Sequence, residues 1–311
     1  HKVLHAALSL KSGRNKVIAE ADCFPSDLYV LEGVKSLRPD LEILLEGRDG
    51  SSIHEMLDEQ VAAVLINHVD YRSGTLREME NLTRQVQEFG GLAVWDLSHS
   101  AGIFPVQLNR CRVDFAVGCT YKYLNGGPGA PAYLYAASRH HTACNQPLSG
   151  WFGHARPFDF ERHFDPDSGI RRFVCGTQPI LSLRALQSGL EIYQDVSLQQ
   201  VREKSMALTD LFIKLLKNEC AAWELEIISP EDASQRGSQV AVSHPQGYAV
   251  MQALISRGVI GDFRAPNLMR FGFAPLFLSY QDIHDAVKQL KQILESEEWN
   301  QEAFLQKSKV T

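Results

Sequence analysis

Two continuous apolar runs with an amphipathic segment between them dominate residues 61–97. Residues 61–67 (VAAVLIN) and 92–97 are largely apolar, as is typical of strands buried on both faces of a parallel sheet. Residues 76–89 carry apolar side chains at helical spacing, and the glycines at 90 and 91 end that segment. A strand, a helix and a strand in this order predict a right-handed βαβ unit.

The rest of the pattern extends this unit into a larger α/β domain with a mostly parallel central sheet. We expect further strands at residues 15–21, 41–45, 113–119 and 132–136, and helices at residues 2–11, 27–37, 52–59 and 179–193. Ser26 is the expected N-cap of the helix at 27–37, and a serine is expected to cap the helix at 52–59. Residues 150–172 are irregular and rich in aromatic residues, arginine and proline, and a connection of this length is usually functional or mobile.

The C-terminal third of the chain predicts a smaller α+β domain. A long helix is expected at residues 201–216, followed by strands at 223–228, 239–242, 259–263 and 268–273 and by helices at 247–257 and 281–296. We place a large domain at residues 1–204 and a small domain at residues 205–311.

Composition narrows the class of protein. The 311 residues are 44% hydrophobic and 22% charged, and the net charge of -6 gives no reason to expect a nucleic acid or an anionic membrane as partner. No apolar run approaches the roughly 20 residues that span a bilayer. The six cysteines are scattered without a CxxC pair, which indicates reduced thiols in a cytoplasmic protein and neither a disulfide framework nor a metal site.

An acid and a lysine follow two of the expected strands. Asp96 comes at the end of one apolar run, and Lys122 comes just after the next, between Tyr121 and Tyr123 and before the glycine-rich NGGPG. Most lysines are simply exposed, and an acid at a strand end is often only a helix cap. A pyridoxal phosphate site, however, needs a partly desolvated lysine for a Schiff base and an acid for the pyridine nitrogen.

Three further features are candidates for the same chemistry. His99 stands three residues after Asp96 and could lie over a flat ring, although a lone histidine is more often structural. Arg270 lies within an apolar strand pattern, where it either pairs with a structural acid or clamps a substrate carboxylate. The NGGPG segment is a weak candidate for a phosphate cradle, because it matches neither GxGxxG nor a P-loop.

Together these segments point to a known family. The motifs WDLSHSAG, CTYKYLNGGPG, SGWFGH, GTQP and MRFGFAPL resemble kynureninase, a pyridoxal phosphate enzyme of the type I aminotransferase fold in its class V branch. The resemblance spans residues 20–290. The spacing of Asp96 and Lys122 alone would indicate only the wider fold, whereas TYKYLN followed by GWFGH is specific to the family.

The resemblance implies roles for the residues around the cofactor. Lys122 would form the Schiff base, and Asp96 would pair with the pyridine nitrogen, with Asp27 of the FPSD motif near the same edge. Phe24 of that motif would stack on the cofactor ring. Tyr121 would reach the cofactor phosphate and assist proton transfer.

Other residues would contact the substrate or a second subunit. His99 would lie beside cofactor and substrate, and Arg270 would hold the substrate α-carboxylate. Trp151 of GWFGH and Thr177 of GTQP resemble residues that approach the phosphate from the partner subunit, which implies a homodimer with shared active sites. A hydroxyl pair that the family places upstream of FPSD is not found here, so we expect the first part of the large domain to lie before His1.

The implied reaction is the hydrolysis of L-kynurenine to anthranilate and L-alanine, a step of tryptophan degradation and of the kynurenine pathway towards NAD. Animal relatives that prefer 3-hydroxykynurenine carry Asn near the position of Thr177. This chain reads Gly176–Thr177 there, which favours the unmodified substrate.

Two alternatives remain open at this stage. A cysteine desulfurase would need a reactive cysteine on a mobile loop of the small domain, where only Cys220 occurs, within a helical pattern. A non-catalytic module that binds the cofactor and dimerises is the other.

Overall fold

The structure is a computed structural model that describes residues 1–48 and 50–306. These residues form two compact units. Unit 1 comprises the described residues of the ranges 1–68, 77–101 and 106–192, and unit 2 comprises residues 69–76, 102–105 and 193–306. The domain boundary expected between residues 204 and 205 falls inside helix α6 (Leu198–Glu219), and the assignment of domains stays a prediction.

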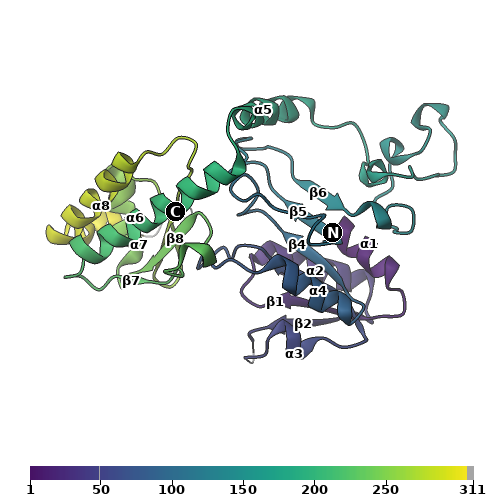
Figure 1. The fold of residues 1–311 in the computed structure, drawn as a ribbon, viewed down its shortest axis with the longest axis horizontal. Coiled ribbons are helices and arrows are strands. Elements are labelled where there is room, and N and C mark those ends of the chain that lie inside the picture. Colours follow the sequence, from purple (N-terminus) through teal and green to yellow (C-terminus); the bar gives the residue numbers. More distant parts are fainter. Residues whose placement is uncertain (49, 307–311) are drawn as a thin grey trace. The chain divides into compact units, whose positions relative to one another are not determined.

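Unit 1 is built on a six-stranded sheet (Figure 1). In order across the sheet, the strands are β2 (Glu42–Glu46), β1 (Lys16–Glu20), β3 (Val61–Asn67), β4 (Leu92–Asp96), β5 (Phe115–Gly118) and β6 (Tyr133–Ala136). The first five run parallel, and β6 is antiparallel to β5. All seven residues of β3 are buried, as its continuous apolar sequence predicts. The expected α/β class with a mostly parallel sheet is thus confirmed.

Helices cover both faces of this sheet. The helices of unit 1 are α1 (Lys2–Leu10), α2 (Pro25–Leu37), α3 (Ile53–Met56), α4 (Met79–Glu88) and α5 (Ile180–Glu191). Helices α1 and α2 pack on Val17 and Ala19 of β1, whereas α3 and α4 share a second apolar cluster with Ile18. Because side chains alternate along a strand, this one strand contributes to both cores.

Two helices begin at other residues than the pattern suggested. The N-cap of α2 is Phe24, with Pro25 in the first turn, so the prediction of Ser26 as N-cap was wrong. Proline is well suited to the first helical position, because it lacks the N–H that would have no partner there. Helix α4 begins at Met79. Its N-cap is Glu78, whose side chain accepts a hydrogen bond from the Asn81 N–H. Ser52 caps α3 in a capping box with Glu55, as expected.

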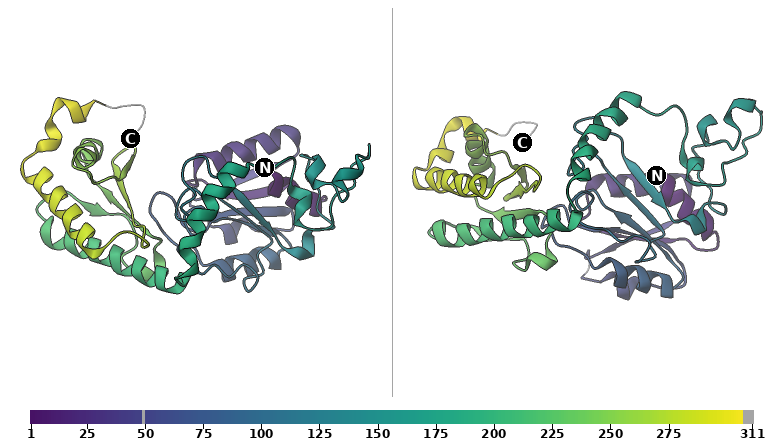
Figure 2. Two further views of the ribbon diagram at one scale, coloured as in Figure 1. Left: turned by 90° about the horizontal axis from the view of Figure 1, so that it is seen from above. Right: turned by 45° about the horizontal axis from the view of Figure 1, so that its top comes forward.

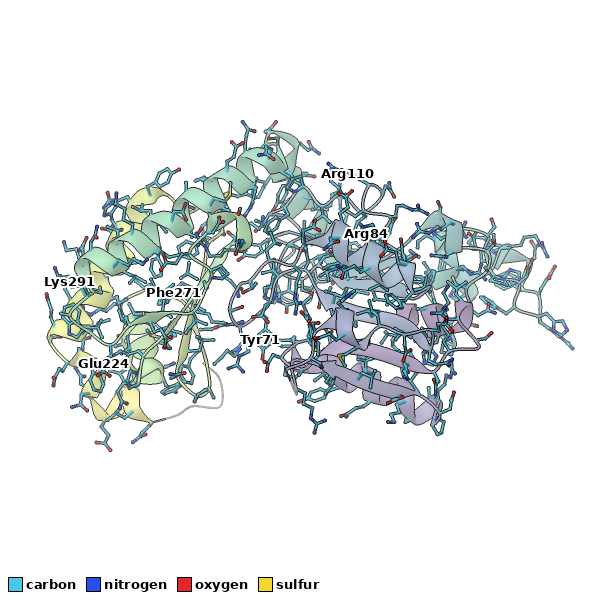
Figure 3. All side chains as sticks on the ribbon, turned by 60° about the horizontal axis from the view of Figure 1, so that its bottom comes forward. Tyr71, Arg84, Arg110, Glu224, Phe271 and Lys291 are labelled. Atoms are coloured by element: carbon cyan, nitrogen blue, oxygen red, sulfur yellow. The ribbon has the colours of Figure 1, made fainter. Side chains whose placement is uncertain are left out.

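Unit 2, whose long C-terminal part is coloured green to yellow in Figure 2, contains a four-stranded antiparallel sheet. The order of its strands is β7-β8-β10-β9. Its elements are α6, β7 (Glu226–Ile227), β8 (Gln239–Ser243), α7 (Gly247–Ser256), β9 (Asp262–Arg264), β10 (Leu268–Gly272), α8 (Tyr280–Glu295) and the unexpected α9 (Glu302–Leu305). The apolar sides of α6, α7 and α8 form its core with Phe271 of β10, while Glu224 lies at the surface (Figure 3).

Short 3-10 helices connect these elements. They are η1 (Ser138–His140), η2 (Trp151–Gly153), η3 (Pro157–Asp159), η4 (Ile170–Phe173), η5 (Ile192–Gln194), η6 (Ala233–Gln235) and η7 (Glu298–Asn300). Three of them, η2 to η4, fall within or next to the irregular segment expected at residues 150–172.

Candidate active site

Asp96 and Lys122 follow the ends of neighbouring parallel strands. Asp96 is the last residue of β4 and pairs in register with Asn67 of β3 and Val117 of β5. Strand β5 ends at Gly118, four residues before Lys122. Since parallel strands bring their carboxyl ends to one edge of the sheet, this edge collects the predicted chemistry. The Ser98 N–H donates a hydrogen bond of 2.6 Å to Asp96 Oδ1 and fixes the carboxylate.

The amine of Lys122 lies against His99. The distance from Lys122 Nζ to His99 Nε2 is 3.0 Å, and Nζ also lies 5.6 Å from the centre of the Tyr121 ring. An imidazole that accepts from the lysine stabilises one orientation of the amine. His99 and Tyr121, which the sequence predicts to lie near the cofactor, are therefore both next to Lys122.

A tight turn and a neighbouring helix fix the backbone after Lys122. The Asn125 N–H donates to the Lys122 carbonyl at 2.9 Å, and the Asn125 φ of 59° is in the left-handed region. A Cβ on Gly189 of α5 would lie 2.6 Å from the Asn125 carbonyl oxygen, so α5 approaches this turn as closely as a glycine allows. Gly189 therefore allows α5 to pack directly against the backbone of this turn.

Asp27 and Asp96 form a carboxyl pair. Asp27 lies in the first turn of α2, and its side chain is hydrogen-bonded to Asp96. Burial, together with the charge of Asp96, raises the pKa of Asp27 to about 7. Among the described residues, Asp27 Oδ2 is buried with no hydrogen-bond partner. The pair therefore holds a proton near neutral pH and presents one unsatisfied buried oxygen.

Phe24 and Tyr121 border this pair. The Asp27 N–H donates to the Phe24 carbonyl at 2.9 Å, so the two residues share the first turn of α2, and the Phe24 side chain is 42% exposed. The pKa of Tyr121 is raised, mainly because its hydroxyl is partly buried. The neighbouring Cys119 thiol and the charge of Asp96 add to this shift. Tyr121 therefore remains a hydrogen-bond donor at neutral pH.

Trp151 lies beside the residues that precede Thr177, at a second place in unit 1. The Phe152 N–H donates to the Cys175 carbonyl at 3.2 Å, and a Cβ on Gly176 would lie 4.0 Å from Trp151 Nε1. The Trp151 side chain is 44% exposed. No contact found among the described residues joins these two residues to the group around Lys122, and their roles stay predictions.

Arg270 belongs to unit 2. It lies on β10, and its Nε donates to Asp262 Oδ1 at 2.6 Å. Its guanidinium also contacts the carbonyl and the ring of Tyr71, a residue labelled in Figure 3. The prediction that it binds a substrate carboxylate is not tested by this geometry.

Comparison with known proteins decides the family. Residues 201–290 match the kynureninase C-terminal domain. The kynureninase of Burkholderia mallei (strain SAVP1) is 46% identical over 299 residues, which are 96% of this chain and 72% of that protein. The kynureninase of Pseudomonas fluorescens is 44% identical over 314 residues, covering 100% of this chain and 76% of that protein. This chain belongs to the kynureninase family.

Solved structures share the fold of this kynureninase family member. A cysteine desulfurase from Thermococcus onnurineus NA1 superposes with a TM-score of 0.75 at 18% identity, covering 93% of this chain and 77% of that one. The cystine C–S lyase C-DES, solved with cysteine persulfide, gives a TM-score of 0.77 at 15% identity, covering 93% of this chain and 80% of that one. At such identities the likeness shows the fold alone, and it confirms the expected fold class.

Three side chains near Asp96 in this kynureninase family member were not predicted from the sequence as site residues. Cys23 is buried, and burial together with the charges of Asp27, Glu20 and Asp96 raises its pKa to about 12. The Tyr133 hydroxyl on β6 is buried without a hydrogen-bond partner in the described part of the chain, and burial and the charge of Asp96 raise its pKa. Glu20 ends β1 and accepts from the Asn67 backbone N–H at 2.8 Å. Glu20 and Tyr133 lie at ends of strands, which was the one signal available in the sequence, and Cys23 carried none.

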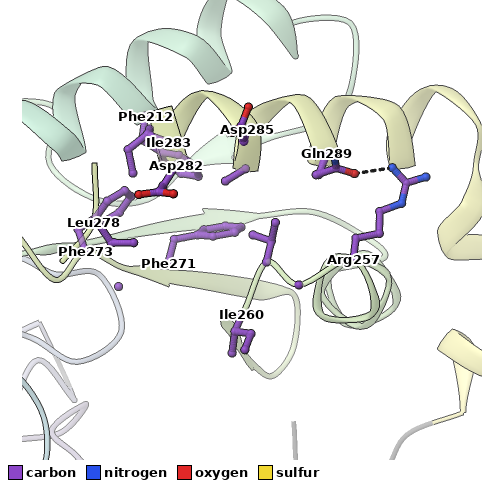
Figure 4. Close-up of a pocket in the computed structure, with 14 residues that line it drawn as sticks. Phe212, Arg257, Ile260, Phe271, Phe273, Leu278, Asp282, Ile283, Asp285 and Gln289 are labelled. Carbon is purple, nitrogen blue, oxygen red and sulfur yellow. Dashed lines mark hydrogen bonds between the residues drawn. The ribbon is translucent and has the colours of Figure 1, made fainter. Parts of the chain in front are cut away.

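A separate cavity of about 390 Å³ lies in unit 2 (Figure 4). Phe271 and Phe273 line its apolar side, and Asp282 and Asp285 of α8 line another side. None of the predicted site residues lines it, so it is not the candidate active site of this kynureninase family member. Within residues 1–48 and 50–306, no group of three or more His, Cys, Asp or Glu side chains could hold a metal ion.

Proposed function

We propose that this chain is a pyridoxal phosphate-dependent hydrolase that cleaves the Cβ–Cγ bond of L-kynurenine to give anthranilate and L-alanine. The observation that carries the proposal is the identity of 44–46% to kynureninases over nearly the whole chain. The arrangement of Lys122, His99, Asp96 and Asp27 at one sheet edge supports it, because it brings together the amine and the carboxyl groups that pyridoxal phosphate chemistry requires.

The alternative of a cysteine desulfurase lacks a suitable thiol. In the described residues after Tyr193, Cys220 is the cysteine present, and it is 1% exposed at the end of α6. Burial raises its pKa to about 11. A thiol of that kind is a poor nucleophile, because the reactive form is the thiolate.

The residues present fit pyridoxal phosphate. The buried, unsatisfied Oδ2 of Asp27 belongs to a half-buried carboxyl pair with Asp96, and this pair suits a protonated pyridine nitrogen. Lys122 would hold the cofactor covalently, and Phe24 would pack on its ring. When bound, the cofactor withdraws electrons from the substrate α-carbon and so makes the neighbouring bonds breakable.

The chain's own residues then handle protons. Lys122 Nζ removes the proton from the substrate α-carbon, and the 3.0 Å contact with His99 Nε2 orients the amine for this step. Tyr121 keeps its proton at neutral pH, because its pKa is raised, and it would therefore be available to donate a hydrogen bond to the cofactor phosphate. Arg270 binds the substrate α-carboxylate, for which a planar guanidinium is suited.

The preferred substrate is kynurenine rather than 3-hydroxykynurenine. The support is the dipeptide Gly176–Thr177, which carries no Asn side chain that could bind a ring hydroxyl. Gly176 lies next to Trp151 in the structure. A pocket without a partner for the hydroxyl would leave that group unpaired on binding.

We further infer a homodimer in which Trp151 and Thr177 contribute to the partner's site. Helix α5 supports this, because its apolar residues are exposed: Leu181 is 87% exposed and Ile180 is 57% exposed. Exposed apolar surface of this kind marks an interface, and a second copy of the chain would cover it in a symmetric dimer.

The state of the cysteines supports a cytoplasmic location. The six cysteines are all free, which fits a cytoplasmic protein. No helix formed by the described residues has the length and apolarity needed to cross a membrane.

The cofactor assignment is tested without measuring turnover. The protein incubated with pyridoxal phosphate is expected to turn yellow, to bleach with borohydride and to yield a peptide labelled at Lys122. The Lys122→Ala variant is expected to stay colourless, whereas Lys288→Ala, an exposed lysine of α8, is expected to behave like the wild type. A labelled Lys122→Ala protein would refute the assignment of this lysine.

A further inference from the structure

Arg270 is held by a carboxylate on the neighbouring strand. Strands β9 and β10 are antiparallel, and Arg270 pairs in register with Asp262. Arg270 Nε donates to Asp262 Oδ1 at 2.6 Å, and Arg270 Nη2 donates to Asp262 Oδ2. The Arg270 side chain is only 11% exposed. A two-point bond of this kind fixes the plane of the guanidinium as well as its position.

Tyr71 restricts the guanidinium further. Arg270 Nη1 donates to the Tyr71 carbonyl, and the guanidinium carbon lies 5.5 Å from the centre of the Tyr71 ring. A guanidinium has five N–H donors. The bonds to Asp262 and Tyr71 engage three of them, which leaves one N–H on each Nη for a further acceptor. Those two N–H groups could bind both oxygens of one carboxylate.

The net charge of the cluster still favours an anion. Arg264 Nη2 lies 3.4 Å from Asp262 Oδ2, so one carboxylate faces two guanidinium groups. Two guanidinium groups and one carboxylate give this cluster of Arg264, Asp262 and Arg270 a formal charge of +1. Asp262 can therefore orient Arg270 without cancelling its attraction for a carboxylate.

We propose that Asp262 is a positioning residue that sets Arg270 for the substrate α-carboxylate, with Arg264 keeping the cluster cationic. This rests on the proposed role of Arg270. If Asp262 were only a competing carboxylate, its removal would raise the net charge to +2 and tighten substrate binding. If it positions Arg270, its removal weakens binding, because the guanidinium loses its fixed orientation. The two accounts predict opposite signs.

The test compares Asp262→Asn with the wild type on two ligands. One is L-kynurenine, and the other is kynuramine, which lacks the α-carboxylate; binding is followed by the absorbance change of the cofactor. We expect KM for L-kynurenine to rise on the order of tenfold to a hundredfold, with a smaller change in kcat and unchanged kynuramine binding. Asp262→Glu keeps the negative charge but moves the carboxylate by the length of one methylene group. KM for L-kynurenine is therefore expected to rise in this variant too.

Two controls make the outcomes distinguishable. Glu298→Gln removes the carboxylate from Arg257, a half-buried pair of the same unit, and is expected to leave both ligands unaffected. Arg270→Gln tests the proposed function itself. If it leaves KM unchanged, the role of Arg270 is wrong and the role of Asp262 with it. If Arg270→Gln weakens binding while folded Asp262→Asn and Asp262→Glu leave it unchanged or tighter, the positioning role alone is overturned.

Discussion

Asp27 and Asp96, which come from a helix and a strand end, share a hydrogen bond at the carboxyl edge of the unit 1 sheet. Two carboxyl groups in contact cannot both be charged at low cost, because burial and mutual repulsion favour one proton between them. Asp27 holds that proton, since its pKa is raised to about 7 from the ordinary 3.8. The pair is thus an acid and a base within one site.

This pair makes the stability of the cofactor-free protein depend on pH. The folded state binds the Asp27 proton more tightly than the unfolded chain, so the contribution is complete below pH 3.8 and is lost as pH rises through about 7. Asp27→Asn keeps a donor to Asp96 but cannot ionise. Relative to the wild type, we expect it to gain on the order of 2 kcal/mol in unfolding free energy between pH 5 and pH 8.

Urea unfolding of the cofactor-free protein at these two pH values measures the effect. Asp22→Asn serves as control, because Asp22 is an exposed aspartate just after β1. Its unfolding free energy is expected to differ little from that of the wild type at either pH. The same difference between Asp27→Asn and the wild type at pH 5 and pH 8 would show that Asp27 is not the titrating group.

The contact between His99 and Lys122 predicts a kinetic defect. His99→Phe removes the partner of Lys122 Nζ at 3.0 Å while keeping an aromatic ring. A hydrogen bond to a charged group is worth about 1.5–3 kcal/mol, so kcat is expected to fall on the order of tenfold to a hundredfold. His284→Gln, on the exposed side of α8, is the control. An unchanged kcat in His99→Phe would exclude a role for this contact in catalysis.

The approach of α5 to the turn after Lys122 predicts a packing defect. In Gly189→Ala the new Cβ would lie 2.6 Å from the Asn125 carbonyl oxygen, so the turn must move. We expect a loss of about 1–3 kcal/mol in stability and weaker cofactor binding. Gly33→Ala on α2 is the matched control, because its Cβ meets nothing within 4 Å. It is expected to gain about 0.5–1 kcal/mol. Thermal melts that rank the two variants the other way would contradict the packing seen here.

The proposed shared site can be tested by mixing inactive variants. If Trp151 acts in the partner's site, a dimer of one Lys122→Ala and one Trp151→Ala subunit contains one intact site. Random mixing gives half hybrid dimers, each with one of two sites intact, so about a quarter of wild-type activity is expected to return. Leu181→Glu, on the exposed face of α5, is expected to prevent both dimerisation and this recovery. If dimers form but mixing restores nothing, the sites are not shared.

The sequence allowed most of the fold to be predicted, for physical reasons. Buried strands such as β3 show continuous apolar runs, and the apolar residues of α4 repeat at helical spacing. Helix starts were less certain, because Ser26 and Pro25 both suit a first turn and only the folded backbone decides between them. The helix expected at 76–89 begins later, at Met79, because Leu76 pairs instead with Val69 in an isolated β-bridge.

The site could be predicted only in part. Parallel strands bring their ends together, which predicts that Asp96 and Lys122 share one edge. The contact of Lys122 with His99 depends on how the loops after β4 and β5 fold, and no periodic pattern encodes it. The pairing of Asp262 with Arg270 depends on the register of β9 against β10. Tyr133 and Cys23 were missed because their significance comes from burial beside Asp96.

The central claim is tested most directly by incubating the protein and pyridoxal phosphate with L-kynurenine or with 3-hydroxykynurenine. Anthranilate is followed by its fluorescence, and hydroxyanthranilate by its own signal. The account predicts alanine and anthranilate in equal amounts from kynurenine, slower release from 3-hydroxykynurenine and no release by Lys122→Ala. A yellow, folded protein that releases neither product would contradict it.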